Sequence, residues 1–407
     1  MRKILKISQQ TLWQIIAKII TALATFSILG LVARNYGEEG TGIFTLTTTY
    51  LGIFYLLADF GFNAYILSRA DKVENEWNKL LGTRLVWALF LIVVALVVFP
   101  ILPFATPFLF AAIIFGSLDI LASAIFVTNN LIFQSKLRYD FVTKATLVGT
   151  TTGLILFLVV LTFKPTVPVL LLAFLSGGVI IAPTSTYLVK QFVSKVKPVF
   201  DITYTKELFI KSWPIAVTLA LNVVYFRIDA FLVSGYRGLS DAGVYNLAYQ
   251  VFQTILVLPT FVMNAYYPLM LQSLKENLIK FEQQLKWGFI TLLIMALIGT
   301  AVVYISAPLI IEIISGQGFD GSVKVLRILS FSFPAYFLSS LLMWVMVARK
   351  KTKIMVLIYL TGLFFNLAAN LIFIPQYSYI AASWITGLSE YLILLLQLLV
   401  LRRLSAV

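Results

Sequence analysis

Residues 212–268 read SWPIAVTLALNVVYFRIDAFLVSGYRGLSDAGVYNLAYQVFQTILVLPTFVMNAYYP, and this stretch decides the fold. Its first apolar run is long enough for a helix that crosses a bilayer, yet Arg227 and Asp229 lie deep inside it. An ionised side chain at such depth is costly unless it faces a wet cavity or a partner. After the turn at 235–243, a second apolar run carries a polar stripe. The stretch therefore predicts two membrane-spanning helices that bear functional side chains.

The composition of the whole chain is that of a multi-spanning membrane protein. Its 407 residues are 60% hydrophobic and 12% charged, whereas a soluble domain carries about 25% charged residues. Neither Cys nor His is present, which excludes thiolate nucleophiles, imidazole bases, disulfides and the usual zinc sites. We therefore expect neither a metal nor a cofactor. The net charge of +14 reflects membrane topology here, and no nucleic-acid partner is expected.

Apolar runs of roughly 20 residues or more predict an all-α membrane protein with twelve spans. Lys18 interrupts the first run, which we interpret as a span and not as a signal peptide. The first six spans are expected at 11–34, 41–69, 82–102, 107–134, 142–163 and 167–189. The second six are expected at 212–235, 242–272, 287–308, 326–348, 354–374 and 379–401.

The distribution of basic residues predicts the orientation of the chain. Of the 31 Lys and Arg residues, 23 fall in loops on the side of the N-terminus, five on the opposite side and three within spans. Cytoplasmic loops carry the excess of Lys and Arg in membrane proteins. Both termini are therefore predicted to lie in the cytoplasm, with the protein in the cytoplasmic (inner) membrane.

The longest polar connection, 191–211, divides the spans six and six. It predicts an N-terminal lobe at 1–190, a cytoplasmic linker at 191–211 and a C-terminal lobe at 212–407. The two halves also repeat, because residues 41–65 align with 242–266 without a gap and share Gly42/Gly243 and Asn63/Asn264. An even number of helices separates the copies, so both cross the membrane in the same direction. Parallel halves related by an axis along the membrane normal are a transporter architecture.

Polar residues at helical spacing form stripes on five of the predicted spans. Helices that line a water-filled cavity need polar faces of this kind. Ser, Thr and Asn side chains also form hydrogen bonds between packed helices, which is the alternative explanation. The basic members suit an anionic headgroup, since guanidinium and ammonium groups bind phosphate strongly. Internal ion pairing, for example of Lys18 with Asp59, is the alternative. The predicted substrate-binding residues are Lys18, Asp59, Asn63, Arg84, Arg227, Asp229 and Asn264.

Two further acids, Asp119 and Glu390, fall near mid-membrane depth. Either carboxylate is able to bind a coupling cation such as Na⁺, or a proton, and either is able to pair with a basic residue. The sequence alone does not distinguish ion binding from pairing with a basic residue. Both are therefore candidates for ion coupling.

Short motifs then occur in a distinctive order: 33–37 (ARNYG), 57–63 (LADFGFN), 225–229 (YFRID), 316–319 (GQGF) and 389–390 (SE). With this order and spacing, the chain resembles the polysaccharide and oligosaccharide flippases, including those for O-antigen, of the multidrug/oligosaccharidyl-lipid/polysaccharide exporter superfamily. One departure is that Ser378 and Tyr379 replace the glycines usual after the proline of the eleventh span.

The resemblance implies two six-helix lobes around a cavity that opens alternately to either side of the membrane. It implies a polyprenyl-diphosphate-linked oligosaccharide as substrate, moved from the cytoplasmic to the outer leaflet for cell-surface polysaccharide synthesis. Lys18, Arg84 and Arg227 would then hold the diphosphate. Membrane lipids and polysaccharide-assembly proteins are the partners that such a role implies.

Two alternatives belong to other classes. A cation-coupled multidrug antiporter of the same superfamily shares the twelve-helix plan, but it predicts a cavity dominated by acids and aromatic residues. A multi-spanning polysaccharide polymerase or ligase is an enzyme and usually needs a sizeable external loop for its catalytic groups. The external loops predicted here are short, so a transporter is favoured over an enzyme.

Overall fold

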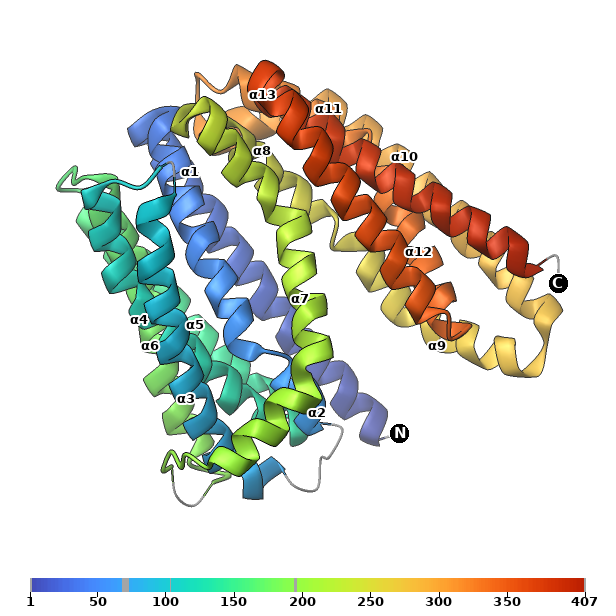
Figure 1. Cartoon of the computed structure of the whole chain (residues 1–407), viewed down its shortest axis with the longest axis horizontal. Helices are drawn as coiled ribbons and strands as arrows, with labels where there is room; N and C mark the ends of the chain where they lie inside the picture. The colour runs from blue at the N-terminus through green and yellow to red at the C-terminus, as the bar shows by residue number, and fades with distance from the viewer. Residues whose placement is uncertain (1, 68–72, 103, 194–195, 406–407) are drawn as a thin grey trace. The chain divides into compact units, whose positions relative to one another are not determined.

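The fold is known from a computed structural model that describes residues 2–67, 73–102, 104–193 and 196–405. All regular structure in these ranges is helical (Figure 1). The first half of the chain contains α1 (Arg2–Asp59), α2 (Phe62–Leu67), α3 (Val73–Val98), the short 3-10 helix η2 (Phe99–Ile101), α4 (Pro107–Ser135), α5 (Tyr139–Leu161) and α6 (Val167–Val189). The second half contains α7 (Ile202–Arg237), α8 (Leu239–Ile255), α9 (Leu258–Glu276), α10 (Leu278–Ser315), α11 (Asp320–Ser330), α12 (Phe333–Ala348) and α13 (Thr352–Ser405).

Within these described ranges, nine helical stretches are long and apolar enough to cross a membrane, or ten if the bent pair α11 and α12 is one span. Two of them, in α1 and α13, are far longer than one crossing requires. The apolar part of α1 alone, Ile16–Asp59, has 44 residues, about 66 Å as a straight helix, against a hydrocarbon core of about 30 Å. Counting each of these as two crossings, and the bent pair α11 and α12 as one, accounts for the twelve predicted spans.

Both long helices turn sharply at a residue with positive φ, and Figure 1 shows each as two rods. In α1 the turn is at Gly37 (φ 64°, ψ −160°), a conformation that costs glycine little. In α13 the turn is at Ser378 (φ 51°, ψ −138°). This is one of the positions where the family that the sequence resembles usually has glycine. The Ser378 hydroxyl donates a hydrogen bond to Asp241, which holds the turn.

Three predicted spans are broken where the backbone cannot continue an α-helix. The span expected at 41–69 stops at Asp59, because Phe60 and Gly61 both have positive φ. The span expected at 242–272 divides into α8 and α9, and Pro259, near the start of α9, has no N–H to donate to the preceding turn. The span expected at 326–348 divides into α11 and α12, which bend by 43° before Pro334.

Contacts between residues divide the chain into two compact units. Unit 1 comprises Met1–Val32 and Ile43–Arg227, and unit 2 comprises Ala33–Gly42 and Ile228–Val407. Their boundary lies inside α7, and the second half of the predicted linker is helical from Ile202 onward. The division into lobes at 191–211 stays a prediction.

In unit 1, the first part of α7 packs onto the end of the helix bundle. The Phe209 ring lies 4.7 Å from that of Phe60 and 5.1 Å from those of Phe62 and Trp87, between ring centroids. Asp201 begins the helix by accepting hydrogen bonds from the backbone N–H groups of the two residues at 203 and 204, as helix caps do. These contacts explain why 202–227 belong to unit 1.

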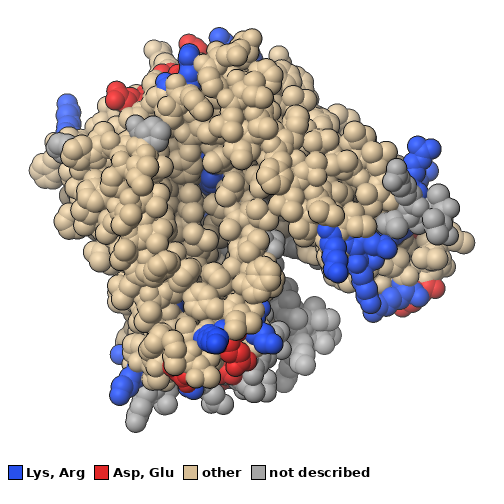
Figure 2. All heavy atoms as spheres, viewed as in Figure 1, with Lys and Arg blue, Asp and Glu red and all other residues tan. Residues whose placement is uncertain are grey.

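In unit 2, α8 is one of the helices that pack directly on one another. It packs against α11 and α13, α10 packs against α11 and α12, and α12 packs against α13. The Ser322 hydroxyl donates to the Val244 carbonyl oxygen at 2.7 Å, and the rings of Phe252 and Phe333 stack 5.5 Å apart. Charged side chains gather near the ends of the helices, and the visible surface between is largely uncharged (Figure 2). That distribution fits the hydrocarbon core of a bilayer.

Candidate functional site

Arg84 is the most enclosed charge of unit 1. It lies on α3, its side chain is 0% exposed, and its Nη2 donates to Asp59 Oδ1 at 2.7 Å and to Asn63 Oδ1 at 2.8 Å. Its Nη1 donates to Thr128 Oγ1 at 3.1 Å, and the Phe62 ring lies 5.6 Å from the guanidinium carbon. Three predicted substrate-binding residues therefore form one cluster.

The local fold explains this cluster. The break at Phe60 and Gly61 ends α1 directly after Asp59, and α2 then places Asn63 beside the same guanidinium. Asn63 is fixed from its other end, because its Nδ2 donates to the Val127 carbonyl oxygen at 3.3 Å. A buried guanidinium requires such a set of acceptors. In this conformation Arg84 faces protein on every side, whereas Asp59 is 25% exposed.

The two other basic residues inside predicted spans are less enclosed. Lys18 is exposed on the first part of α1, and Arg227 is half-buried on α7. Within the described part of the chain, Arg227 makes neither a hydrogen bond nor an ion pair through its side chain. A guanidinium at this depth without a protein anion is available to an anionic ligand.

Asp229 lies two residues from Arg227 but in a different environment. It is 2% exposed, and Asn370 Nδ2 donates to its Oδ1 at 2.7 Å. Its Oδ2 accepts from Thr386 Oγ1 at 2.8 Å and from the Tyr245 hydroxyl at 3.2 Å. The carboxylate thus joins α7, α8 and both halves of α13 within unit 2 by hydrogen bonds from neutral groups.

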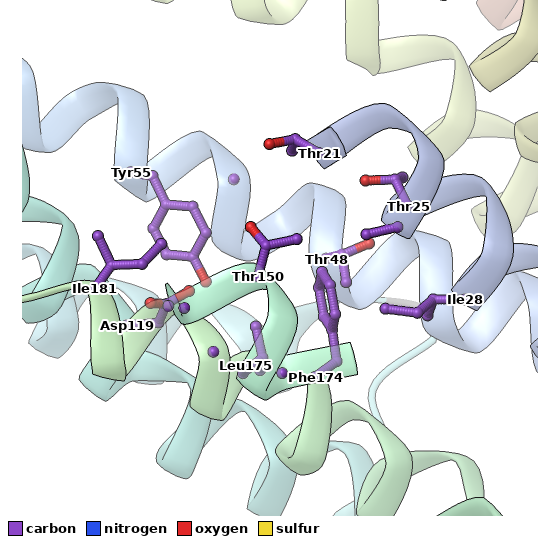
Figure 3. A pocket seen from close by; sticks show the side chains of 16 residues that line it. Thr21, Thr25, Ile28, Thr48, Tyr55, Asp119, Thr150, Phe174, Leu175 and Ile181 are labelled. Atoms are coloured by element: carbon purple, nitrogen blue, oxygen red, sulfur yellow. The ribbon is translucent and has the colours of Figure 1, made fainter. Parts of the chain in front are cut away.

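The remaining predicted residues are placed separately. Glu390 is 2% exposed in unit 2 and accepts a hydrogen bond from Ser339 of α12. Asp119 lies on α4 in unit 1, at the wall of a cavity, with the Tyr55 hydroxyl beside it (Figure 3). The side chain of Asn264 lies outside the described residues. The structure therefore gathers Asp59, Asn63 and Arg84 in unit 1, while Asp229 and Glu390 belong to unit 2.

Several polar partners were not among the predicted residues. Thr128, Asn370 and Thr386 complete the two networks, but each looks in the sequence like an ordinary polar residue of a packed helix. Tyr55 gave no signal, because one aromatic residue in an apolar helix is usually part of the packing.

Several solved structures share the fold of this chain. It is similar to a structure of a lipid II flippase MurJ in an inward closed conformation, with a TM-score of 0.78, 16% identity and coverage of 96% of this chain and 87% of that chain. It is also similar to an inward-facing multidrug resistance MATE family transporter, with a TM-score of 0.71, 14% identity and 95% of each chain covered. A Pyrococcus furiosus transporter with a reversed polarity of its binding pocket gives a TM-score of 0.64 at 14% identity, covering 98% of this chain and 96% of that chain.

The chain is thus a multi-pass membrane transporter of the multidrug/oligosaccharidyl-lipid/polysaccharide exporter superfamily, and not an enzyme. The family model described as polysaccharide biosynthesis protein matches residues 7–274, and the chain belongs to that family. A second model, MatE, matches residues 214–372. No curated protein sequence matches the chain.

Proposed function

We propose that this transporter is a flippase that moves a polyprenyl-diphosphate-linked oligosaccharide from the cytoplasmic to the outer leaflet. Membership of the polysaccharide biosynthesis family supports a glycan substrate, and the similarity to a lipid II flippase supports one that is linked to a lipid. The single observation that carries the proposal is Arg227, a half-buried guanidinium inside a spanning helix with no side-chain partner in the described part of the chain.

The charges divide into two kinds in this proposal. Lys18 and Arg227 contact the diphosphate directly, because both side chains are at least partly accessible. Arg84 acts through Asp59 and Asn63, whose positions it fixes. Asp229 is bound by three protein donors and stabilises the packing around α7.

Transport would proceed by alternating access, with the two lobes rocking about the 191–211 linker. The headgroup would occupy the cavity while the lipid tail stays in the bilayer. Such a change is driven only if the substrate binds the two states with different affinity. In a cytoplasmic membrane with both termini inside, the excess of basic residues at the cytoplasmic ends would favour loading from that side.

The test is translocation of a labelled polyprenyl-diphosphate oligosaccharide in proteoliposomes. Wild type is compared with Lys18→Ala, Arg227→Ala and Arg227→Lys, and Lys164→Ala on an exposed loop is the matched control for loss of one cation. We expect strong loss in both alanine variants, partial activity with Arg227→Lys and full activity in the control. Normal transport in all variants would show that these charges do not bind the substrate.

A multidrug antiporter is the second candidate, favoured by the MatE match over residues 214–372 and by the similarity to MATE transporters. It would export organic cations, and the accessible cations Lys18 and Arg227 argue against such a cargo. The same proteoliposomes distinguish the two. Export of an organic cation by a wild type that moves no lipid-linked glycan would establish the antiporter.

A further inference from the structure

One face of unit 2 presents aromatic rings and two cations from neighbouring helices. There α11 packs against α10 and α13, which lie beside it in Figure 1. The rings are those of Tyr304 on α10, Phe331 directly after α11 and Trp384 on α13, and they are 41%, 45% and 48% exposed. The described part of the chain therefore leaves these large side chains partly uncovered.

The two cations and one of the rings form a row on α11. Lys324, Arg327 and Phe331 are spaced by three and four residues, so they lie on the same side of the helix. Lys324 is exposed and Arg327 is partly exposed. Along the helix axis the three residues lie about 6, 10 and 16 Å from Asp320, where α11 begins. The row thus passes from charge near the helix end to an aromatic ring further along.

Phe331 and Trp384 form a flat apolar surface. Their ring planes differ by only 5°, with centroids 6.4 Å apart, and the Tyr304 ring lies 5.5 Å from that of Phe331. The surface is fixed at the bend between α11 and α12, because the Tyr391 hydroxyl donates to the Phe331 carbonyl oxygen at 2.8 Å. An ordered apolar surface of this kind suits a hydrocarbon chain.

A proline explains how the Arg327 guanidinium is held. Pro308 of α10 has no N–H, so the carbonyl oxygen of Tyr304, four residues earlier, lacks its usual helical donor. Arg327 Nε donates to that oxygen at 3.1 Å, and the guanidinium carbon lies 5.1 Å from the centroid of the Tyr304 ring. This contact ties α11 to α10 and fixes the orientation of the guanidinium.

The contact with Tyr304 uses only one of the five N–H groups of Arg327. The two terminal nitrogens form neither a hydrogen bond nor an ion pair with any described residue, and the same is true of the Lys324 ammonium. The acids nearest in the sequence, Glu312 and Asp320, are exposed and pair with neither cation in the described ranges. Two cations on one helix face are therefore available to a single anion.

We infer that this face of unit 2 binds an anionic phospholipid of the surrounding bilayer. The lipid phosphate accepts hydrogen bonds from Lys324 and Arg327, and one acyl chain lies against Phe331 and Trp384. Guanidinium and ammonium groups bind phosphate strongly, and basic residues near a membrane surface attract anionic lipids. The order of charge and ring along α11 matches the order of headgroup and chain in a lipid, whereas free phosphate would match the cations alone.

This lipid site goes beyond the proposed function, since it involves neither the glycan nor the movement of the lobes. It lies where two helices are interrupted, at Pro308 in α10 and at the bend that follows Ser330. A ligand that binds only the folded protein stabilises it. The bound phospholipid therefore holds α10, α11 and α13 together at a place where their own backbone hydrogen bonding is incomplete.

The test uses a fluorophore on one introduced cysteine, which the cysteine-free sequence allows. Leu388→Cys places the label one turn from Trp384 on α13, and Ile294→Cys on α10 is the matched control position, because both leucine and isoleucine are 51% exposed. The labelled full-length protein is placed in phosphatidylcholine nanodiscs. Phosphatidylglycerol or phosphatidylcholine with a nitroxide quencher on its acyl chain is then added in increasing amounts. The mole fraction that gives half of the quenching measures the relative affinity for the two lipids.

We expect a preference for phosphatidylglycerol of about fivefold or more at position 388, since one cation at a membrane surface has about that effect. Position 294 should show no preference. Lys324→Gln leaves the Arg327 contact with Tyr304 intact and should lower the preference several-fold. Lys324→Gln combined with Arg327→Gln should abolish it. Lys353→Gln, at an exposed cation near the start of α13, is the matched control and should leave it unchanged.

Equal quenching by the two lipids at position 388, or an unchanged preference in a folded Lys324→Gln protein, would overturn the inference. Arg327→Lys keeps the charge and should retain more of the preference than Arg327→Gln does. Equal loss in these two variants would assign the effect to the contact with Tyr304 and not to phosphate binding. Inorganic phosphate or an unlabelled polyprenyl diphosphate that relieves the quenching at equal concentration would give the site to that ligand instead.

Discussion

Gly42 and Gly243 lie against each other in unit 2, and each touches the backbone beside the other. A Cβ added to Gly42 would lie 1.9 Å from the Leu239 carbonyl oxygen, and one added to Gly243 would lie 1.9 Å from that of Glu38. Both glycines and both carbonyl groups are 201 positions apart in the sequence. The two contacts are therefore equivalent in the internal repeat: each glycine touches the residue that corresponds to the contact of the other glycine. This is the arrangement expected around a local two-fold axis.

Alanine at either glycine should disrupt this contact. The added methyl group would meet a rigid carbonyl, and the helices would have to separate, at a cost of about 1–3 kcal/mol. We expect Gly42→Ala and Gly243→Ala to lower the melting temperature in detergent by similar amounts. Gly299→Ala on α10 is the control, since its Cβ would meet only the Phe333 ring, at 3.9 Å. A thermal transition unchanged in both variants would contradict the close approach.

Arg84 should be more important for stability than for substrate affinity. Its removal leaves the Asp59 carboxylate without its cation, and breaking a buried pair costs about 3–5 kcal/mol, toward the lower end here because Asp59 is 25% exposed. We expect Arg84→Ala to lower the melting temperature. Arg84→Lys should restore only part of it, because an ammonium group cannot reproduce the planar, forked hydrogen bonding of a guanidinium. Substrate affinity that falls while the melting temperature holds would instead make Arg84 a direct ligand.

Asp229 should behave as the centre of a hydrogen-bonded network. Asp229→Asn turns one acceptor into a donor that faces Thr386 or Asn370, and we expect a loss of about 1–3 kcal/mol. Thr386→Val removes one donor to the carboxylate. Because the two residues touch, the double variant should lose less than the sum of the single losses. Strict additivity in thermal or denaturant unfolding would mean that they do not interact.

The cap of α7 gives a pH dependence outside the membrane. Lys79 Nζ lies 2.7 Å from Asp201 Oδ2, and this hydrogen bond, together with those from backbone N–H groups, lowers the pKa of the Asp201 carboxyl. A lowered pKa means that the stabilisation is complete above the unfolded value of about 3.9 and is lost as the pH falls through the folded value. Asp201→Asn should therefore differ from wild type in melting temperature at pH 7, and the difference should shrink as the pH falls below the unfolded pKa and through the lowered folded one. A difference that persists in acid would assign the effect to packing.

The sequence predicted the helical plan well because apolar length and charge are strong signals in a membrane protein. Arg227 and Asp229 are two residues apart on a helix and so point to different faces, and their surroundings differ: Arg227 is half-buried, whereas Asp229 is buried. The helix breaks at Phe60 and Ser378 were harder to predict from the sequence. Neither residue type favours positive φ, and the surrounding packing imposes this conformation. The ends of the spans were predicted less well, because α3, α7 and α10 begin nine or ten residues before the spans expected from 82, 212 and 287.

The candidate site was predictable only in part. An ionised side chain inside a membrane span is energetically costly, which makes it a candidate functional residue. Arg84, Asp59 and Asp119 were therefore selected as candidates from the sequence alone. Their pairing was not found: the ion pair considered for Asp59, as the alternative to substrate binding, was with Lys18, whereas the structure pairs Asp59 with Arg84. Which charges meet depends on how α1, α2 and α3 pack, and the neutral partners Thr128 and Tyr55 become visible only in that packing.

The ion pair between Asp59 and Arg84 also bears on how the chain enters the membrane. A guanidinium is among the most unfavourable groups for a nascent helix to carry out of the translocon, at about 2.5–3.5 kcal/mol. Asp59 is synthesised 25 residues before Arg84, so its carboxylate is already in place when α3 emerges. The acid is therefore available as a partner for the guanidinium of the helix that follows.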